Sequence, residues 1–174
     1  MYLVIKSWTK WYNSIQTFNA IRGKFQIMND YTTTNIEKHP TKDTNDSHIN
    51  GELAVVWRDW DDIIKNYPKM VYVSSINPGE IKGPHIHTKR TSHFVCIHGK
   101  VIFIIKNNDG TYSEIESSDE HPVLIHIPKN IASAHINLST DISRVLALAD
   151  ISWKPNDNEM VNTIFDDYDW KKWI

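Results

Sequence analysis

A series of short β-type runs after Pro68 is the feature that most constrains how this chain can fold. The runs are rich in branched and aromatic residues, which favour strands. Turn formers separate them, including "NPGE" after Ile76, "NNDG" at 107–110 and "KN" after Pro128. Short strands at this spacing are typical of an all-β sandwich or barrel. The runs are "MVYVSSI", "SHFVCI", "KVIFIIK", "TYSEIES", "PVLIHIP", "SAHINLS" and "RVLALADI".

Two of these runs, "SHFVCI" and "KVIFIIK", flank His98 and Gly99. A glycine between two apolar runs is a hairpin signal, so we expect a tight hairpin here. His98 would then lie exposed in the turn. Cys96, within the first run, is expected to be a small buried residue of the core.

The sequence before the β-rich region differs from it in composition and in the spacing of its apolar residues. Residues 1–28 are predicted to be a short helical N-terminal extension, because apolar residues recur at three- and four-residue steps. Residues 29–50 are polar and rich in turn formers, which predicts a linker. Residues 51–174 form the predicted domain, in which 57–68 reads as one short helix that Pro68 ends. The periodic apolar residues of the extension are Trp8, Trp11, Ile15, Phe18 and Ile21.

The composition excludes several classes of protein. The chain has 174 residues, of which 40% are hydrophobic and 23% charged, as in an ordinary single globular domain. A formal net charge of -2 is not the basic excess that is typical of nucleic-acid-binding proteins. No apolar run is long enough to span a bilayer. One cysteine allows no internal disulfide. We therefore expect a cytoplasmic protein without nucleic-acid or membrane partners.

The stretch "IKGPHIHTK" at 81–89 carries the strongest chemical signal. In an extended strand alternate side chains share a face, so His85 and His87 lie on one side together with Ile81 and Gly83. Lys82 falls on the opposite side. Two histidines on one face can converge on a point inside a barrel, and Gly83 leaves room for a ligand beside them. We interpret this stretch as part of a site.

These residues carry a family resemblance. The stretch "NPGEIKGPHIHTKRTSHFVCIHGKVIFII" resembles the first cupin motif, and "VLIHIPKNIASAHINLS" resembles the second. Within cupins, "KGPH" and "ALADISWKPNDNEM" resemble segments of the dTDP-4-dehydrorhamnose 3,5-epimerase and dTDP-sugar isomerase group. The resemblance covers roughly residues 50–174 in motif order. It implies an all-β cupin jelly roll, an RmlC-like β-barrel, that pairs as a homodimer.

The resemblance also implies an activity. Members of that group abstract a proton next to the C4 ketone of a nucleotide-linked sugar. His85 takes the place of the catalytic base, a role that suits imidazole because its pKa lies near neutrality. Lys82 takes the place of the residue that binds the nucleotide phosphates, and Lys89 and Arg90 could add phosphate contacts. The further site residues expected here are His87 and His93 as catalytic or pocket-lining groups, and Tyr72 and His135 as substrate contacts.

The chain departs from the epimerase pattern at two positions. The family places a tyrosine acid near the segment aligned with "LALADISW", where this chain has Trp153. Tyr72 or Tyr112 could supply the missing donor. The second-motif histidine of the family aligns with Ser133, and His135 lies two residues further on, which keeps it on the same face. These departures leave a ketoisomerase or a single-centre epimerase open.

Two other functions remain open from the residues. A metal-dependent cupin, such as a dioxygenase or isomerase, would hold a divalent metal such as Zn on His85, His87 and His135. However, no carboxylate occurs between His87 and Gly99, where a metal cupin supplies one. The expected enzyme therefore uses no cofactor. A non-catalytic sugar-binding cupin is the third hypothesis. Glu80 and Asp141 could orient a histidine, as carboxylates around functional histidines do.

Overall fold

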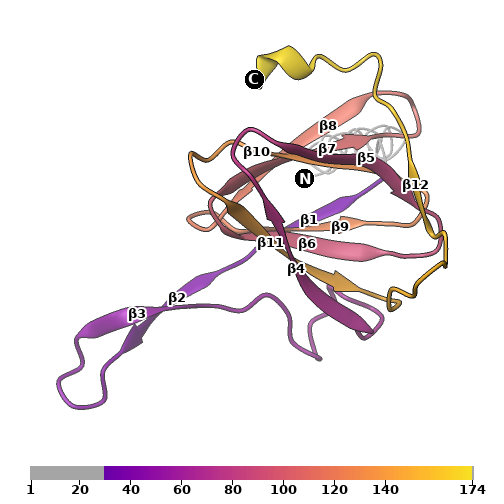
Figure 1. Cartoon of the computed structure of the whole chain (residues 1–174). Helices are drawn as coiled ribbons and strands as arrows, with labels where there is room; N and C mark the ends of the chain where they lie inside the picture. The colour runs from indigo at the N-terminus through magenta and orange to yellow at the C-terminus, as the bar shows by residue number, and fades with distance from the viewer. Residues whose placement is uncertain (1–29, 174) are drawn as a thin grey trace, which may run out of the picture.

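The computed structural model describes residues 30–173, and the predicted N-terminal helix therefore lies outside the described residues. The described chain is almost entirely β (Figure 1). A single 3-10 turn, η1 (Trp170–Lys172), follows the last strand within this part of the chain. The strands are β1 (Thr32–Asn35), β2 (Lys38–Lys42), β3 (Ile49–Ala54), β4 (Met70–Ile76), β5 (Ile81–His87), β6 (Ser92–His98), β7 (Lys100–Lys106), β8 (Tyr112–Ser118), β9 (Val123–Ile127), β10 (Ala132–Asn137), β11 (Ser143–Ala149) and β12 (Met160–Asn162).

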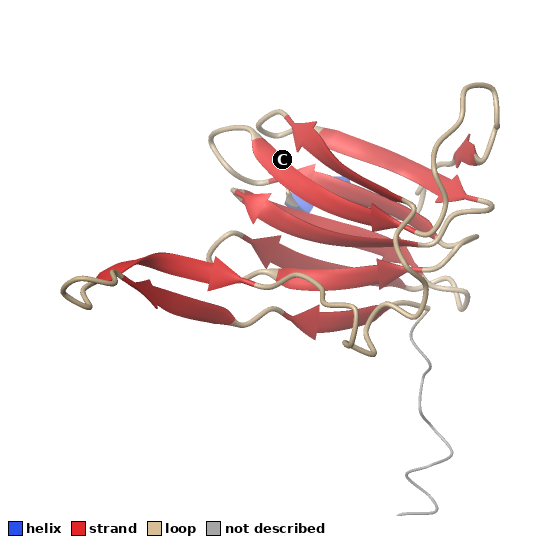
Figure 2. Cartoon of the chain, turned by 90° about the horizontal axis from the view of Figure 1, so that it is seen from below, coloured by secondary structure: helices blue, strands red, loops and turns tan. Residues whose placement is uncertain are grey.

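Ten of the strands form two five-stranded antiparallel sheets that face each other (Figure 2). The first sheet has the order β1-β9-β6-β11-β4, and the second has the order β12-β5-β10-β7-β8. Strands next to each other in the chain mostly belong to different sheets, as the jelly-roll arrangement requires. The expected all-β jelly roll is confirmed.

The core lies in three layers. The largest cluster fills the space between the sheets and includes Phe94 from the first sheet and Phe103 from the second. A second cluster lies outside the second sheet, where Phe165 and Tyr168 of the C-terminal tail cover β7 and β10. A third lies outside the first sheet, where Ile64 packs on Val95, Leu124 and Leu148. The central strands β6 and β7 are thus buried on both faces, which explains their nearly continuous apolar runs.

The predicted hairpin at His98 and Gly99 is wrong. β6 and β7 pair with other strands and belong to opposite sheets, so Gly99 marks a corner at which the chain crosses from one sheet to the other. Gly99 has a φ of +75°, and a Cβ there would lie 2.5 Å from Ser143 Oγ. A glycine between two apolar runs therefore signals a sharp bend, and only long-range pairing decides whether the bend closes a hairpin.

The region before Pro68 also differs from expectation. Residues 32–42, assigned to a polar linker, form β1 and β2, and β1 adds to the first sheet beside β9. Residues 57–68 form turns instead of a helix. The Asp61 carboxylate accepts hydrogen bonds from the backbone N–H and Nε of Arg58, which closes a turn in place of a helical one. Packing of Ile64 on the sheet overrides the local helical pattern.

The hairpin of β2 and β3 projects away from the barrel (Figure 1). All six residues of β3 are exposed, among them the apolar Ile49 and Leu53. In the described part of the chain, no helix is long and apolar enough to cross a membrane.

Candidate active site

A cavity of about 400 Å³ opens between the two sheets, and we call it the inner cavity. β5 and β10 of the second sheet contribute His85, His87 and His135 to it, and β4 of the first sheet contributes Tyr72. Its remaining lining residues are Met70, Ser74, Lys82, Gly83, Arg90, Phe94, Phe103, Ile127, Ser133, Val145, Trp153 and Met160. The inner cavity therefore brings together six of the eight predicted site residues, namely Tyr72, Lys82, His85, His87, Arg90 and His135, while Lys89 and His93 lie outside it.

Lys82 lines the same cavity as His85, although simple alternation along β5 places it on the opposite face. The register between β5 and β10 shifts between the pairs Ser133–His85 and His135–Lys82, so β5 carries one extra residue there. This bulge returns Lys82 to the side of the histidines. Lys82 Nζ donates a hydrogen bond of 2.8 Å to Ser74 Oγ on the facing sheet. The predicted opposite-face position of Lys82 is therefore wrong.

Gly83 is required by the close approach of β5 to β10. Its φ is +88°, and a Cβ at this position would lie 2.8 Å from the backbone oxygen of Ser133. A side chain here would have to push the two strands apart, since the obstructing atom belongs to the backbone. The space that the sequence analysis assigned to a ligand beside Gly83 is thus partly taken by β10.

His87 is held by two buried charged groups. Its Nδ1 lies 3.1 Å from Oε2 of Glu159, and Nη2 of Arg90 lies 3.0 Å from both of its ring nitrogens. Arg90 and Glu159 also form an ion pair at 3.1 Å, with only 8% and 4% of their side chains exposed. The pKa of His87 is lowered by burial and by the Arg90 charge, which Glu159 opposes. The three side chains form a fixed polar group at the cavity wall.

Glu159 contacts the candidate site, and sequence reasoning missed it. It lies just before β12, whose pairing with β5 places the segment beside His87. The backbone oxygen of Glu159 also accepts hydrogen bonds from the N–H and hydroxyl of Thr88. The sequence signal for it is the glutamate of "KPNDNEM", within the segment that resembles the isomerase group. Glu80 and Asp141, proposed instead as orienting carboxylates, do not line the cavity.

His85 and His135 are both poised to remain neutral. Burial, with smaller contributions from the neighbouring His87 and Arg90, lowers the pKa of His85. Burial lowers the pKa of His135 to about 3. The Nε2 atom of His135 is buried and has no hydrogen-bond partner among residues 30–173. A neutral imidazole can accept a proton, and an unpaired ring nitrogen can bind a polar ligand atom.

Of the two tyrosines considered as proton donors, only Tyr72 lies in the inner cavity. It belongs to β4, in the sheet that faces the one carrying His85. Burial raises its pKa, so its hydroxyl stays protonated near neutral pH. Tyr112 instead packs against Phe165 and donates a hydrogen bond to Asp167. Trp153 lines the cavity with 62% of its surface exposed.

The two predicted site residues outside the inner cavity have other partners. Lys89 Nζ forms an exposed ion pair of 2.6 Å with Asp157. His93 stacks on His126, with ring centroids 4.5 Å apart. Its neighbour Phe94 points into the inner cavity, and alternation along β6 therefore directs His93 to the outer face of the first sheet.

The histidines predicted as an alternative metal site do not form a compact set of ligands. Within residues 30–173, one group of three potential ligands has its atoms within 4.8 Å of one another, and it consists of Asp43, Asp46 and His48 in the projecting hairpin. His85, His87 and His135 would need to move before they could share one ion in the tetrahedral or octahedral geometry of a metal site.

The two facing sheets with a histidine-lined cavity between them have the jelly-roll fold of RmlC-like cupins. The family comparison then places the chain more narrowly. The model of the family described as "FdtA: WxcM-like, C-terminal" matches residues 29–168, and the chain belongs to this family. The match begins within the segment first interpreted as a linker, in agreement with the position of β1 in the sheet. No curated protein matches the chain.

Solved structures with the same fold include three sugar-modifying enzymes. A dTDP sugar isomerase from Desulfovibrio desulfuricans G20 has a TM-score of 0.66 and 15% identity, over 78% of this chain and 85% of that one. QdtA, a sugar 3,4-ketoisomerase from Thermoanaerobacterium thermosaccharolyticum in complex with TDP, has a TM-score of 0.61 and 17% identity, over 79% and 90%. ChmJ, a 3'-monoepimerase from Streptomyces bikiniensis in complex with dTDP-quinovose, has a TM-score of 0.63 and 13% identity, over 76% and 69%.

Proposed function

We propose that this protein is an isomerase, either a ketoisomerase or an epimerase, that acts on a nucleotide-linked 4-keto sugar of the dTDP type. The observation that carries the proposal is the arrangement of the inner cavity. A neutral histidine, His85, lies on one sheet, and a protonated tyrosine, Tyr72, lies on the facing one. Such a pair of groups suits proton transfer to and from a carbon next to a ketone.

In the proposed reaction, His85 removes the proton from the carbon next to the ketone. The electron pair of the broken C–H bond forms a C=C bond, and the ketone oxygen becomes an enolate. Return of a proton to the same carbon from the opposite side, by Tyr72, inverts that centre. Return of the proton to the former ketone carbon, with a proton moving between the two oxygens, shifts the ketone by one position. Neither outcome consumes an oxidant or a reductant.

The other cavity residues have supporting roles in this proposal. His87, held by Glu159 and Arg90, would hydrogen-bond the sugar oxygens near the reacting carbon. His135 would bind a sugar oxygen through its unpaired Nε2. Lys82 would contact the diphosphate, since its ammonium group lies in the cavity and pairs only with the neutral Ser74 hydroxyl among the described residues. Support also comes from the solved neighbours, whose names include dTDP-sugar isomerases and epimerases.

The experiment is to incubate the protein with dTDP-4-keto-6-deoxyglucose in D₂O and to follow the sugar by NMR. Deuterium at the former ketone carbon with a ketone at C3 identifies a ketoisomerase. Deuterium at an inverted carbon with the ketone retained at C4 identifies an epimerase. Binding of dTDP without deuterium incorporation into this or other nucleotide-linked 4-keto sugars would overturn the proposal in favour of a binding protein.

We further propose that the reaction needs no metal cofactor. The imidazole of His85 supplies the base, and the cavity contains neutral hydrogen-bond donors for the enolate oxygen. Extensive treatment with a chelator should therefore leave the rate of deuterium incorporation unchanged. A rate that falls on chelation and returns with Zn²⁺ would favour the metal-dependent alternative.

We also propose that the protein works as a homodimer in the cytoplasm. The projecting hairpin exposes Ile49 and Leu53, and an isolated two-stranded hairpin is only marginally stable in water. A second copy would cover these residues. The buried cysteine and the nucleotide-sugar substrate fit a reducing compartment. Light scattering of the full chain should give twice the mass of the monomer, and Leu53→Lys should lower it.

A further inference from the structure

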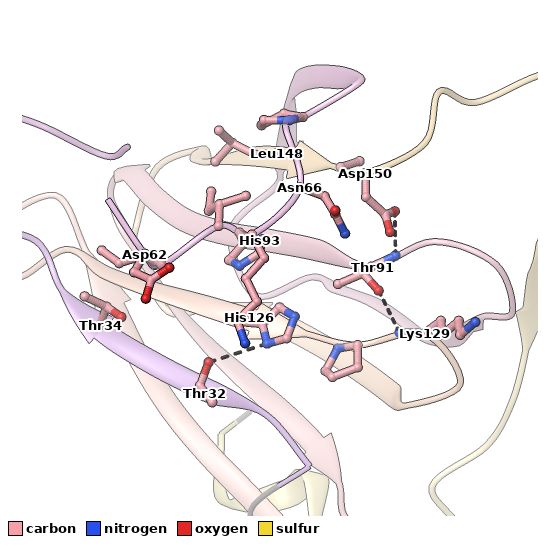
Figure 3. Close-up of a pocket in the computed structure, with 16 residues that line it drawn as sticks. Thr32, Thr34, Asp62, Asn66, Thr91, His93, His126, Lys129, Leu148 and Asp150 are labelled. Atoms are coloured by element: carbon pink, nitrogen blue, oxygen red, sulfur yellow. Dashed lines mark hydrogen bonds between the residues drawn. The ribbon is translucent and has the colours of Figure 1, made fainter. Parts of the chain in front are cut away.

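A second cavity, of about 560 Å³, lies on the outer face of the first sheet (Figure 3). We call it the outer cavity. Its floor is formed by His93 and His126, and the irregular segment 62–68 covers it from above. It shares no lining residue with the inner cavity. The first sheet separates the two, because adjacent residues of β6 such as His93 and Phe94 point to opposite faces.

The two histidines on the floor are polar residues on a face of the first sheet that is otherwise largely apolar. Further along the same face, Ile64 packs on Val95, Leu124 and Leu148, as expected for simple packing. At His93 and His126 the face turns polar, and the covering segment leaves a hollow. The rings stack at 4.5 Å with an interplanar angle of 26°. The backbone of Ile63 on the covering segment hydrogen-bonds His93, and the Thr32 hydroxyl lies 3.4 Å from Nδ1 of His126, so both rings have polar partners at the edge of the hollow.

Both imidazoles are neutral near neutral pH. Burial lowers the pKa of His93 to about 4, and the neighbouring His126 makes a smaller contribution in the same direction. Burial also lowers the pKa of His126, against the opposing effect of Asp150. The floor therefore offers flat, uncharged rings whose nitrogens can donate or accept hydrogen bonds.

The rim supplies hydrogen-bonding groups of both kinds without a net charge. Asp62 and Asn66 lie on the covering segment, and Thr32 and Thr34 lie on β1 (Figure 3). The carboxylates of Asp62 and Asp150 are balanced by the ammonium groups of Lys65 and Lys129. A phosphate would meet no net positive charge, because the two carboxylates offset the two ammonium groups and the imidazoles are uncharged. A ligand with several hydroxyl groups and no charge fits these donors and acceptors.

We propose that the outer cavity binds an uncharged sugar ring, with hydroxyl groups on Asp62, Asn66 and the β1 threonines and its apolar face over His126 and Leu148. The cavity lies within the size range of small-molecule sites, which combine apolar walls with a few polar groups. This inference does not depend on the proposed reaction, because the two cavities lie on opposite faces of the first sheet.

The experiment records histidine side-chain NMR spectra of the full chain during titration with methyl α-D-glucopyranoside, methyl α-L-rhamnopyranoside and methyl N-acetyl-β-D-glucosaminide. At least one glycoside should shift the His93 and His126 signals, and saturating dTDP should not displace it. Asp62→Ala and Asn66→Ala should each weaken binding by about tenfold. Both residues are exposed, so neither variant should unfold the protein.

Asp59→Ala is the matched control, because Asp59 is exposed in the same covering region but does not line the cavity. It should bind the glycoside as the unmodified chain does. The proposal is overturned if no glycoside shifts His93 and His126, if Asp59→Ala weakens binding as much as Asp62→Ala, or if dTDP displaces the glycoside. Tighter binding of a sugar phosphate than of its methyl glycoside would also overturn it.

Discussion

The inner and outer cavities both contain histidines whose pKa values are lowered by burial, yet their surroundings differ. In the inner cavity, His87 contacts the buried ion pair of Arg90 and Glu159, and Tyr72 faces the histidines from the opposite sheet. In the outer cavity, His93 and His126 stack on each other, with their charged neighbours confined to the rim. A neutral histidine alone therefore does not mark a catalytic site.

The comparison shows which features suggest chemistry. Proton transfer needs one group that can remove a proton and a second that can return it, and the inner cavity places His85 and Tyr72 on facing sheets. The outer cavity has flat rings and hydrogen-bonding groups, which suit binding without reaction. The predictions below test this division, beginning with the largest expected effect.

Replacement of the proposed base should have the largest effect. His85→Ala should slow deuterium incorporation into the nucleotide-linked 4-keto sugar by about 10²–10⁴-fold, because general-base catalysis by a positioned side chain contributes that much. Binding of dTDP should be largely retained. His98→Ala is the control, since His98 is half exposed at the corner between the sheets. Equal losses in both variants would refute the role of His85.

The sequence predicted much of the inner cavity, but it could not predict which residues long-range strand pairing brings next to the histidines. The pattern H-x-H placed His85 and His87 together, because that relation depends only on strand alternation. His93 was grouped with them by proximity in sequence, although alternation along β6 turns it outward. Lys82 was placed on the wrong face because the bulge in β5 depends on pairing with β10. Glu159 approaches His87 through the pairing of β12 with β5, 72 residues away in sequence.

The fold class, like the shared face of His85 and His87, could be predicted because it follows from local sequence patterns. Short apolar runs and turns were enough to predict the jelly roll, which the two sheets confirm. Which strands pair depends on contacts between distant segments, so local sequence predicts a hairpin at Gly99 where the structure has a corner between the sheets. The local pattern of residues 57–68 predicts a helix, whereas the sheet beneath this segment sets its conformation.

Loss of the buried carboxylate should destabilise the inner cavity. Glu159→Ala leaves Arg90 buried without its ion-pair partner, and breaking such a pair typically costs about 3–5 kcal/mol. The free energy of unfolding, measured with urea, should fall by roughly this amount. Asp157→Ala provides the control, because its ion pair with Lys89 is exposed and should contribute no more than about 1 kcal/mol. Similar losses of unfolding free energy in the two variants would show that the buried ion pair contributes no more to stability than the exposed one.

Acid should destabilise both cavities. The pKa values of His135 and His93 in the folded protein are about 3 and about 4, below the ordinary value of 6.5. Below pH 6.5 the unfolded chain therefore binds more protons than the folded one, and stability falls as the pH drops toward these lower values. Urea unfolding across this pH range should show the decline. His135→Gln and His93→Gln should each reduce its slope, and an unchanged slope in both would contradict the assignment.

The smallest effect is expected from the two lysines. Lys82→Ala should weaken dTDP binding by about tenfold, as for one lost hydrogen bond to a charged group, and should change the rate of chemistry less. Lys89→Ala should leave dTDP binding unchanged, because Lys89 lies outside the inner cavity and pairs with Asp157. Calorimetric titration of both variants with dTDP measures the difference. A larger loss of dTDP affinity in Lys89→Ala than in Lys82→Ala would place the phosphate site nearer to Lys89.

The central claim is that the nucleotide sugar occupies the inner cavity and not the outer one. The chain has nine histidines, and those of the two cavities provide separate reporters in one histidine side-chain NMR spectrum. Addition of dTDP should shift the signals of His85, His87 and His135 and leave those of His93 and His126 in place. Shifts confined to His93 and His126, or no shifts in the inner cavity at saturating dTDP, would contradict the claim.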